Sequence, residues 1–193
     1  MSESLYETHL TVDCSDLDHL RAWASAADLK LTVIELARGR MPMQPMLTLR
    51  GDTYDAQRAR AREVSGSLRA AGFAPVRVKT ESAPWAPEVP DGPCGEGRYF
   101  EHHVKLRLAE GGALTELTEL AALVVPFGAH LSRNVRRRHE RFVTQRCRGT
   151  DAGGARRALG ELLDALAGFE VLSVEREFVL YDSDESVDEG WLA

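Results

Sequence analysis

Two short Glu-x-His segments carry the clearest chemical potential in this sequence. They are Glu7-Thr-His9 and Glu101-His-His103, which lie 94 residues apart. In a β-strand, residues i and i+2 point to the same side, so each segment places a carboxylate beside an imidazole. An imidazole gains or loses a proton near neutral pH, and a carboxylate next to it can orient and tune it. The pattern therefore predicts general acid–base chemistry.

Alternation along other strand-like segments adds cations and hydroxyls to the same surface. Thr48, Arg50, Thr144 and Arg146 alternate with apolar residues that suit a core, so they belong to the polar side. Since a guanidinium binds carboxylates and phosphates through a planar fork, the arginines indicate an anionic ligand. The predicted catalytic residues are His9, His103, Lys105 and Glu177. The predicted ligand-binding residues are Glu7, Arg50, Glu101, His130, Ser132, Thr144, Arg146 and Glu175.

The second Glu-x-His segment is expected to dominate. There, His103 is the predicted acid or base, Lys105 and Arg146 stabilise an anion or transition state, and Glu101 and Glu177 orient the imidazole. The predicted function is binding of a small phosphorylated or carboxylated molecule in a polar cleft between sheet faces. The protein would act on it as a metal-independent hydrolase or lyase by acid–base catalysis.

Other interpretations of these polar surfaces stay open. An open sheet face in water is normally polar, and cross-strand ion pairs stabilise sheets by only about 0.2–1 kcal/mol each. The protein could instead be a ligand-sensing or protein-interaction module without catalysis, whose sheet faces form a dimer interface. No H-E-x-x-H motif, carboxylate cluster, phosphate loop or dinucleotide motif is visible, so we expect neither a metal nor a cofactor.

A weak internal repeat shows which elements must position these residues. Residues 6–12 resemble residues 100–106, residues 46–51 resemble 142–147, and Ala71-Gly-Phe73 matches Ala167-Gly-Phe169. The three matches keep the same order at nearly one offset, which favours a tandem duplication. In the first half we expect strands at 6–12, 29–36, 46–50 and 73–81, with helices after Ser15 and over 53–71. In the second half we expect strands at 99–108, 129–135, 141–147 and 169–181, with helices over 114–125 and 152–167.

Each half therefore reads β-α-β-β-α-β, the order of a ferredoxin-like unit. Such a unit has an antiparallel sheet in strand order 4-1-3-2, with both helices on one face. The predicted fold class is α+β, with two such units at residues 1–81 and 99–181. A linker rich in proline and glycine joins them at 82–98. An acidic tail, expected to be a solvated end, follows at 182–193, and Trp191 and Leu192 indicate that its last turn packs back.

Composition narrows the class of partner. The 193 residues include 30 acidic and 24 basic side chains, a net charge of −6, which argues against broad nucleic-acid binding. The arginine-rich run at 133–141 is most simply a solvated loop.

No apolar run of about 18 residues predicts a membrane span, and no secretory leader is visible. The three cysteines show no paired spacing, so we expect a cytoplasmic protein, with a homodimer as an open alternative.

The segment His9-Leu-Thr-Val12 resembles the His-x-Thr signature of the 2H phosphoesterases, bilobed enzymes that cleave cyclic phosphates with two such motifs. This resemblance implies a hydrolase as a third possibility. The second motif departs from the pattern, because Lys105 stands where the hydroxyl belongs, and His130-Leu-Ser132 restores it only on a different strand. We therefore assign no family from the sequence.

Overall fold

The computed structural model describes residues 4–36, 39–108, 114–137 and 139–188, and shows a mixed α/β protein built around one antiparallel sheet. The strands are β1 (Tyr6–Asp13), β2 (Lys30–Leu36), β3 (Met43–Gly51), β4 (Ala74–Ser82), β5 (Tyr99–Arg107), β6 (Ala129–Asn134), β7 (Glu140–Arg148) and β8 (Glu170–Asp182). The helices are α1 (Leu17–Ala26), α2 (Tyr54–Ala70), α3 (Leu114–Val124) and α4 (Ala152–Ala165), with short turns η1 (Val125–Phe127) and η2 (Glu185–Asp188). The predicted order of elements is confirmed in both halves.

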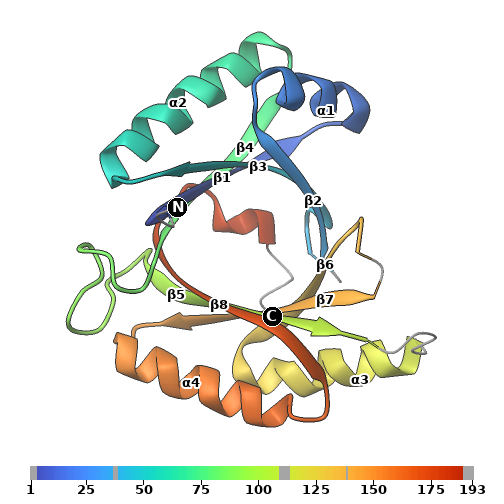
Figure 1. Cartoon of the computed structure of the whole chain (residues 1–193), viewed down its shortest axis with the longest axis vertical. Helices are drawn as coiled ribbons and strands as arrows, with labels where there is room; N and C mark the ends of the chain where they lie inside the picture. The colour runs from blue at the N-terminus through green and yellow to red at the C-terminus, as the bar shows by residue number, and fades with distance from the viewer. Residues whose placement is uncertain (1–3, 37–38, 109–113, 138, 189–193) are drawn as a thin grey trace.

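The strands close into a single barrel in the order β1-β3-β2-β6-β7-β5-β8-β4 (Figure 1). Within each half, the first and third strands are central, as predicted. The prediction of separate sheets is wrong, because β2 pairs with β6 and β4 pairs with β8, both antiparallel. A free edge strand exposes unpaired backbone donors and acceptors, and pairing the edges of the two halves satisfies them.

Local signals explain where the helices begin. The Thr53 hydroxyl accepts from the backbone N–H of Ala56 and caps α2. The Asp16 carboxylate caps α1 and accepts from the backbone N–H of His19 at 2.9 Å. Two glycines weaken the start of α4, but Asp151 accepts from the N–H of Gly154 at 2.6 Å and offsets this cost.

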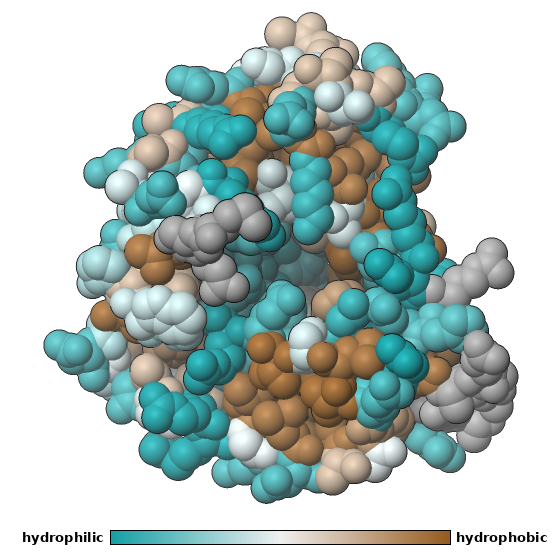
Figure 2. Space-filling view, in the orientation of Figure 1, coloured by the Kyte–Doolittle hydropathy of each residue, from teal (hydrophilic) through white to brown (hydrophobic). Residues whose placement is uncertain are grey.

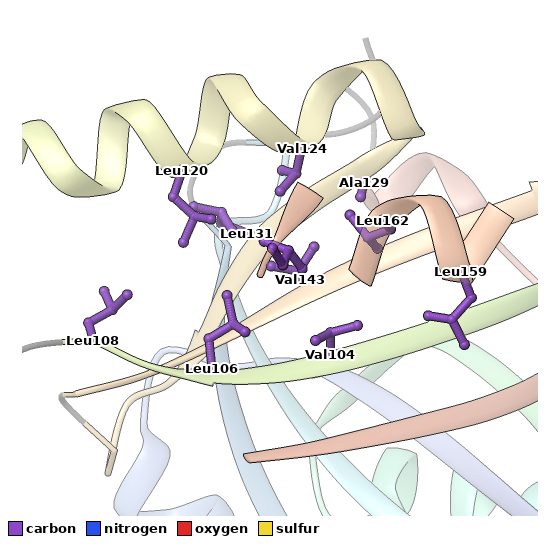
Figure 3. Packing of buried hydrophobic residues seen from close by; sticks show 11 residues of the cluster. Val104, Leu106, Leu108, Leu120, Val124, Ala129, Leu131, Val143, Leu159 and Leu162 are labelled. Carbon is purple, nitrogen blue, oxygen red and sulfur yellow. The ribbon is translucent and has the colours of Figure 1, made fainter. Parts of the chain in front are cut away.

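The apolar core lies outside the barrel, between the sheet and the helices. In the second half it is formed by residues such as Val104, Leu106, Leu120, Val143 and Leu162 (Figure 3). A matching cluster lies beneath α1 and α2 in the first half. Each half of the barrel therefore buries its apolar face under helices and turns its polar face inward. In the described strands the polar faces considered above for a dimer interface thus lie inside the barrel.

The two halves use the same strand register on that inner face. Glu7 lies opposite Arg50, as Glu101 lies opposite Arg146. His9 lies opposite Thr48, as His103 lies opposite Thr144. The predicted equivalence of these positions therefore holds in the structure, while an origin by gene duplication stays a prediction.

The linker and the tail contribute more than the sequence indicated. The linker has no regular structure, but Ala86 and Cys94 are buried in a third apolar cluster. The tail is not only a solvated end, since η2 lies within the ring of strands, where Val187 and Asp188 are buried (Figure 1). The predicted packing of Trp191 and Leu192 concerns residues outside the described part of the chain. No helix among the described residues is long and apolar enough to cross a membrane.

Candidate functional site

The polar inner faces enclose a cavity of about 950 Å³, within the usual range for small-molecule sites. Figure 2 shows a hollow with hydrophilic walls between the two halves of the molecule. Charged residues of β1, β4, β5 and β8 line one side, and Ile34, Leu36, Met46 and Phe142 add apolar surface. Trp85 of the linker also lines the cavity and is 67% exposed. The cavity can therefore take a ligand with both a polar and an apolar part.

His103 is held from both of its ring nitrogens. Its Nδ1 lies 2.9 Å from the Thr144 hydroxyl on the neighbouring strand β7. Its Nε2 lies 3.3 Å from a Glu101 oxygen and 3.1 Å from a Glu177 oxygen. The side chain remains 22% exposed and lines the cavity. The imidazole is thus fixed in orientation while staying accessible to a ligand.

Glu101 is the permanently ionised partner of this imidazole. Its carboxylate is fully buried, accepts from Arg146 Nε at 2.6 Å, and contacts the Lys79 ammonium. Burial alone would raise the pKa of Glu101, but Lys79 and Arg146 outweigh it and hold that pKa well below the usual range. Glu101 therefore supplies a fixed negative charge.

Glu177 shows the opposite behaviour on the other side of the same ring. Burial raises the pKa of Glu177, and the nearby charge of Glu81 adds to the effect against the pull of His103. Burial opposes the charge on His103, but its hydrogen bonds to Glu101 and Glu177 prevail and raise the pKa of His103 to about 10. Of the two carboxyl groups that contact His103, Glu177 is thus the one whose pKa is shifted toward neutral pH.

The first half presents an equivalent histidine with different partners. His9 Nδ1 and the Thr48 hydroxyl are 3.2 Å apart, and His9 Nε2 lies 3.1 Å from Glu81 and 3.8 Å from Glu7. The Lys79 ammonium bridges Glu81 and Glu101. An alternating chain of acids and bases therefore runs across four adjacent strands, from β1 through β4 and β8 to β5.

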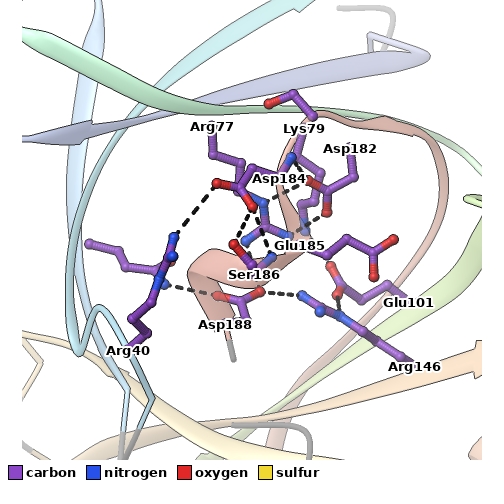
Figure 4. A network of polar contacts seen from close by, with 12 residues as sticks. Arg40, Arg77, Lys79, Glu101, Arg146, Asp182, Asp184, Glu185, Ser186 and Asp188 are labelled. Atoms are coloured by element: carbon purple, nitrogen blue, oxygen red, sulfur yellow. Dashed lines mark hydrogen bonds and ion pairs between the residues drawn. The ribbon is translucent and has the colours of Figure 1, made fainter. Parts of the chain in front are cut away.

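The two arginines predicted to bind an anion are already paired with carboxylates of the chain. Arg146, only 4% exposed, donates to Glu101 and also to Asp188 at 2.8 Å (Figure 4). Arg50 is 60% exposed and pairs with Glu7 at 2.7 Å. Of these two arginines, Arg146 alone is buried inside the barrel.

The remaining predicted residues divide between the cavity and its surroundings. Thr144, Ser132 and Glu175 line the cavity, and His130 is buried opposite Thr144. Lys105 instead pairs with Glu140 at 2.7 Å and is not among the lining residues, so its predicted catalytic role has no support from its position.

Sequence reasoning overlooked Lys79, Arg77 and Asp188 as site residues. Alternation along β4 puts Arg77 and Lys79 on the same side as Glu81, and this signal was available. Asp188 lies in the acidic tail, where no periodic pattern predicts a position.

Four groups could together hold a metal ion: single ligand atoms of Glu81, Glu101, His103 and Glu177 lie within 4.8 Å of one another. The Lys79 ammonium contacts two of these carboxylates, Glu81 and Glu101. The Lys79 ammonium therefore already offsets part of the negative charge that a divalent ion would neutralise.

Comparisons with known proteins do not assign this chain. No family model matches it, and no curated protein matches it. The acetolactate synthase small subunit from Thermotoga maritima is 12% identical with a TM-score of 0.31, over 93% of this chain and 96% of that one. A dye-decolorizing protein from V. cholerae is 9% identical with a TM-score of 0.30, over 93% and 94%. A protein from Fusobacterium nucleatum, named as a proposed monooxygenase, is 10% identical with a TM-score of 0.36, over 96% of both chains.

Scores at this level support no argument about function. The function must therefore be argued from the site itself.

Proposed function

We propose that the barrel cavity binds a small anionic molecule, that Glu177 exchanges a proton with it, and that the His103 imidazolium supports this exchange through its Nε2 proton. In this proposal the protein is a metal-independent acid–base enzyme. The observation that carries the proposal is the pair of carboxylates on one imidazole, whose pKa values are shifted in opposite directions. Separation of two acids by their environments is a recurrent way in which enzymes divide acid and base roles.

The geometry gives each residue a distinct part. Protonated His103 donates from Nδ1 to Thr144 and directs its Nε2 proton toward Glu101 and Glu177. Glu177 is 20% exposed and lines the cavity, so it can accept a proton from a ligand group or return one. Glu101 keeps its charge throughout and stabilises the imidazolium, a positioning role.

The cavity also has features that favour an anion with an apolar portion. Lys30 and Arg176 line it and form no ion pair with any described residue, so they can attract negative charge at the rim. The imidazolium adds positive charge inside. Met46 and Phe142 offer a surface for the apolar portion.

The first test is native mass spectrometry of the freshly purified protein, followed by thermal-shift measurements with phosphorylated and carboxylated metabolites. We expect a retained anion, or one class that raises the melting temperature by several degrees. A protein that carries no small molecule and responds to none of these metabolites would contradict the proposal.

Once a ligand class is known, measurements of turnover in single variants test the catalytic role of each residue. His103→Gln and Glu177→Gln should each lower kcat by about 10²–10⁴-fold, the usual contribution of a general acid or base. His9→Gln tests the predicted catalytic role of the equivalent histidine in the first half, which lies 3.1 Å from Glu81, a carboxylate that Lys79 contacts. We expect a smaller loss of kcat there than for His103→Gln. Turnover that survives both second-half substitutions would exclude these catalytic roles.

A further inference from the structure

A carboxylate is bound inside the barrel by three side chains of its wall. Asp188 Oδ2 accepts from Arg77 at 2.7 Å and from Arg146 at 2.8 Å, and Oδ1 accepts from the Gln44 amide at 2.9 Å (Figure 4). These donors come from β4, β7 and β3, and all three side chains are buried. Both oxygens of one carboxylate are thus matched by charge-assisted and neutral donors.

The donors are positioned independently of Asp188. Arg77 Nε donates to Asp182 at 2.8 Å, and Arg146 Nε donates to Glu101 at 2.6 Å. Each guanidinium therefore keeps a second carboxylate that fixes its plane when Asp188 is elsewhere. Gln44, Arg77 and Arg146 of the barrel wall therefore form a binding site for a carboxylate, and Asp188 reaches it from a turn that is not part of the sheet.

Asp188 belongs to the short turn η2, which the described part of the chain holds by few contacts. η2 has four residues, and Val187 is its buried apolar anchor. Asp184 lies 3.6 Å from Arg40, and Glu185 contacts Arg148, with all four side chains at least one-third exposed. Exposed ion pairs of this kind contribute only about 0–1 kcal/mol. Besides the burial of Val187, the strongest contacts of the turn are thus the three that Asp188 itself makes, and a ligand carboxylate would replace these.

We propose that Gln44, Arg77 and Arg146 form a carboxylate-binding subsite of the cavity, occupied in this structure by Asp188 and available to the acid group of a ligand. This inference rests on the proposed function for its ligand. Arg146 joins the subsite to Glu101, which contacts His103. A ligand carboxylate held here would place the rest of the molecule beside His103 and Glu177.

Charge favours a carboxylate over a phosphate. The charges of Arg77, Arg146 and Lys79 already face Asp182, Glu101 and Glu81. The His103 imidazolium, which contacts Glu101, adds one positive charge, so this network balances a single further negative charge. A phosphate dianion would leave uncompensated charge in a buried position, which is costly.

The test is chemical rescue of Asp188→Ala by acetate, followed by thermal unfolding. At 50 mM acetate and a dissociation constant of about 1 mM, the melting temperature of the variant should rise by about 5–9 °C. The wild type should respond no more to acetate than to sodium chloride of equal ionic strength. Asp184→Ala is the matched control, because it alters the same tail but leaves the subsite occupied.

Selective and saturable rescue of Asp188→Ala supports the subsite. Absence of rescue, or equal stabilisation of the wild type and Asp184→Ala, overturns it, and equal rescue by inorganic phosphate overturns the preference for carboxylates. Should Asp188→Ala fail to fold, Asp188→Ser keeps a small polar side chain, leaves the space of the carboxylate open and permits the same comparison. The assay measures binding without turnover, so its failure is separate from a failure of the catalytic proposal.

Discussion

The two histidines of the barrel occupy equivalent positions but have different surroundings. Each faces a threonine across the strand pair and directs Nε2 toward two carboxylates. In the second half, Glu101 is fully buried beside a buried Arg146, whereas in the first half Glu7 is 27% exposed and pairs with an exposed Arg50. The same residue types in the same register thus provide a solvent-facing pair in one half and a buried charge system in the other.

One substitution between the halves explains much of this contrast. Lys79 lies opposite His9, but the equivalent position opposite His103 is Glu175. The ammonium of Lys79 contributes to lowering the pKa of Glu81 against the effect of burial, while Glu177 has no such lysine on its own strand and its pKa is raised. Burial and one neighbouring charge therefore decide whether the pKa of the carboxyl beside each histidine is lowered, as in Glu81, or raised, as in Glu177.

The largest expected difference between the two halves is in how much the loss of a carboxylate lowers the free energy of unfolding. Glu101→Gln leaves Lys79 and Arg146 without their shared buried carboxylate, which should cost about 3–5 kcal/mol. Glu7→Gln removes only a partly exposed ion pair, worth about 0–1 kcal/mol. For a chain of this size, the melting temperatures should fall by about 6–20 °C and by less than about 4 °C, respectively. Equal losses in calorimetry would remove the distinction between the halves.

The free energy of unfolding should fall as the pH rises above neutral, because of the raised pKa of His103. The pKa of His103 is about 10 in the folded chain and about 6.5 when unfolded, so the folded state holds a proton that the unfolded state releases. Its stabilisation is complete below about pH 6.5 and is lost as pH rises through about 10. Urea titrations at pH 7, 8 and 9 should show a falling unfolding free energy, with a flatter profile in His103→Gln. Parallel profiles would contradict the assignment.

The smallest effect concerns metals. Because Lys79 already neutralises Glu81 and Glu101, a chelator should leave the wild-type melting temperature unchanged. Lys79→Met removes this fixed cation, and manganese or zinc should then raise the melting temperature of the variant but not of the wild type. A chelator-induced drop of several degrees in the wild type, restored by either metal, would show that the acids serve as ligands.

Alternation and strand order predicted a large part of the site. They place Glu101, His103, Thr144 and Arg146 on the same face of two adjacent central strands, which is where the structure has them. The register that sets Glu101 opposite Arg146 is known from the structure alone. Pairing of β2 with β6 and of β4 with β8 could not be predicted, because an edge strand carries no local signal of its partner in a different unit. The position of Asp188 was equally hidden, since a short acidic turn has no periodicity to indicate burial.

The central claim is that His103 is held as an imidazolium between Glu101 and Glu177 inside the barrel, and direct titration of His103 by nuclear magnetic resonance tests it most closely. Spectra of wild type with ¹⁵N-labelled histidine should show an imidazolium through neutral pH, with a pKa of about 10. In Glu177→Gln, the pKa of His103 should fall, because one of its two carboxylate partners is lost. A wild-type His103 that titrates near 6.5, or that is unchanged by Glu177→Gln, would contradict the account.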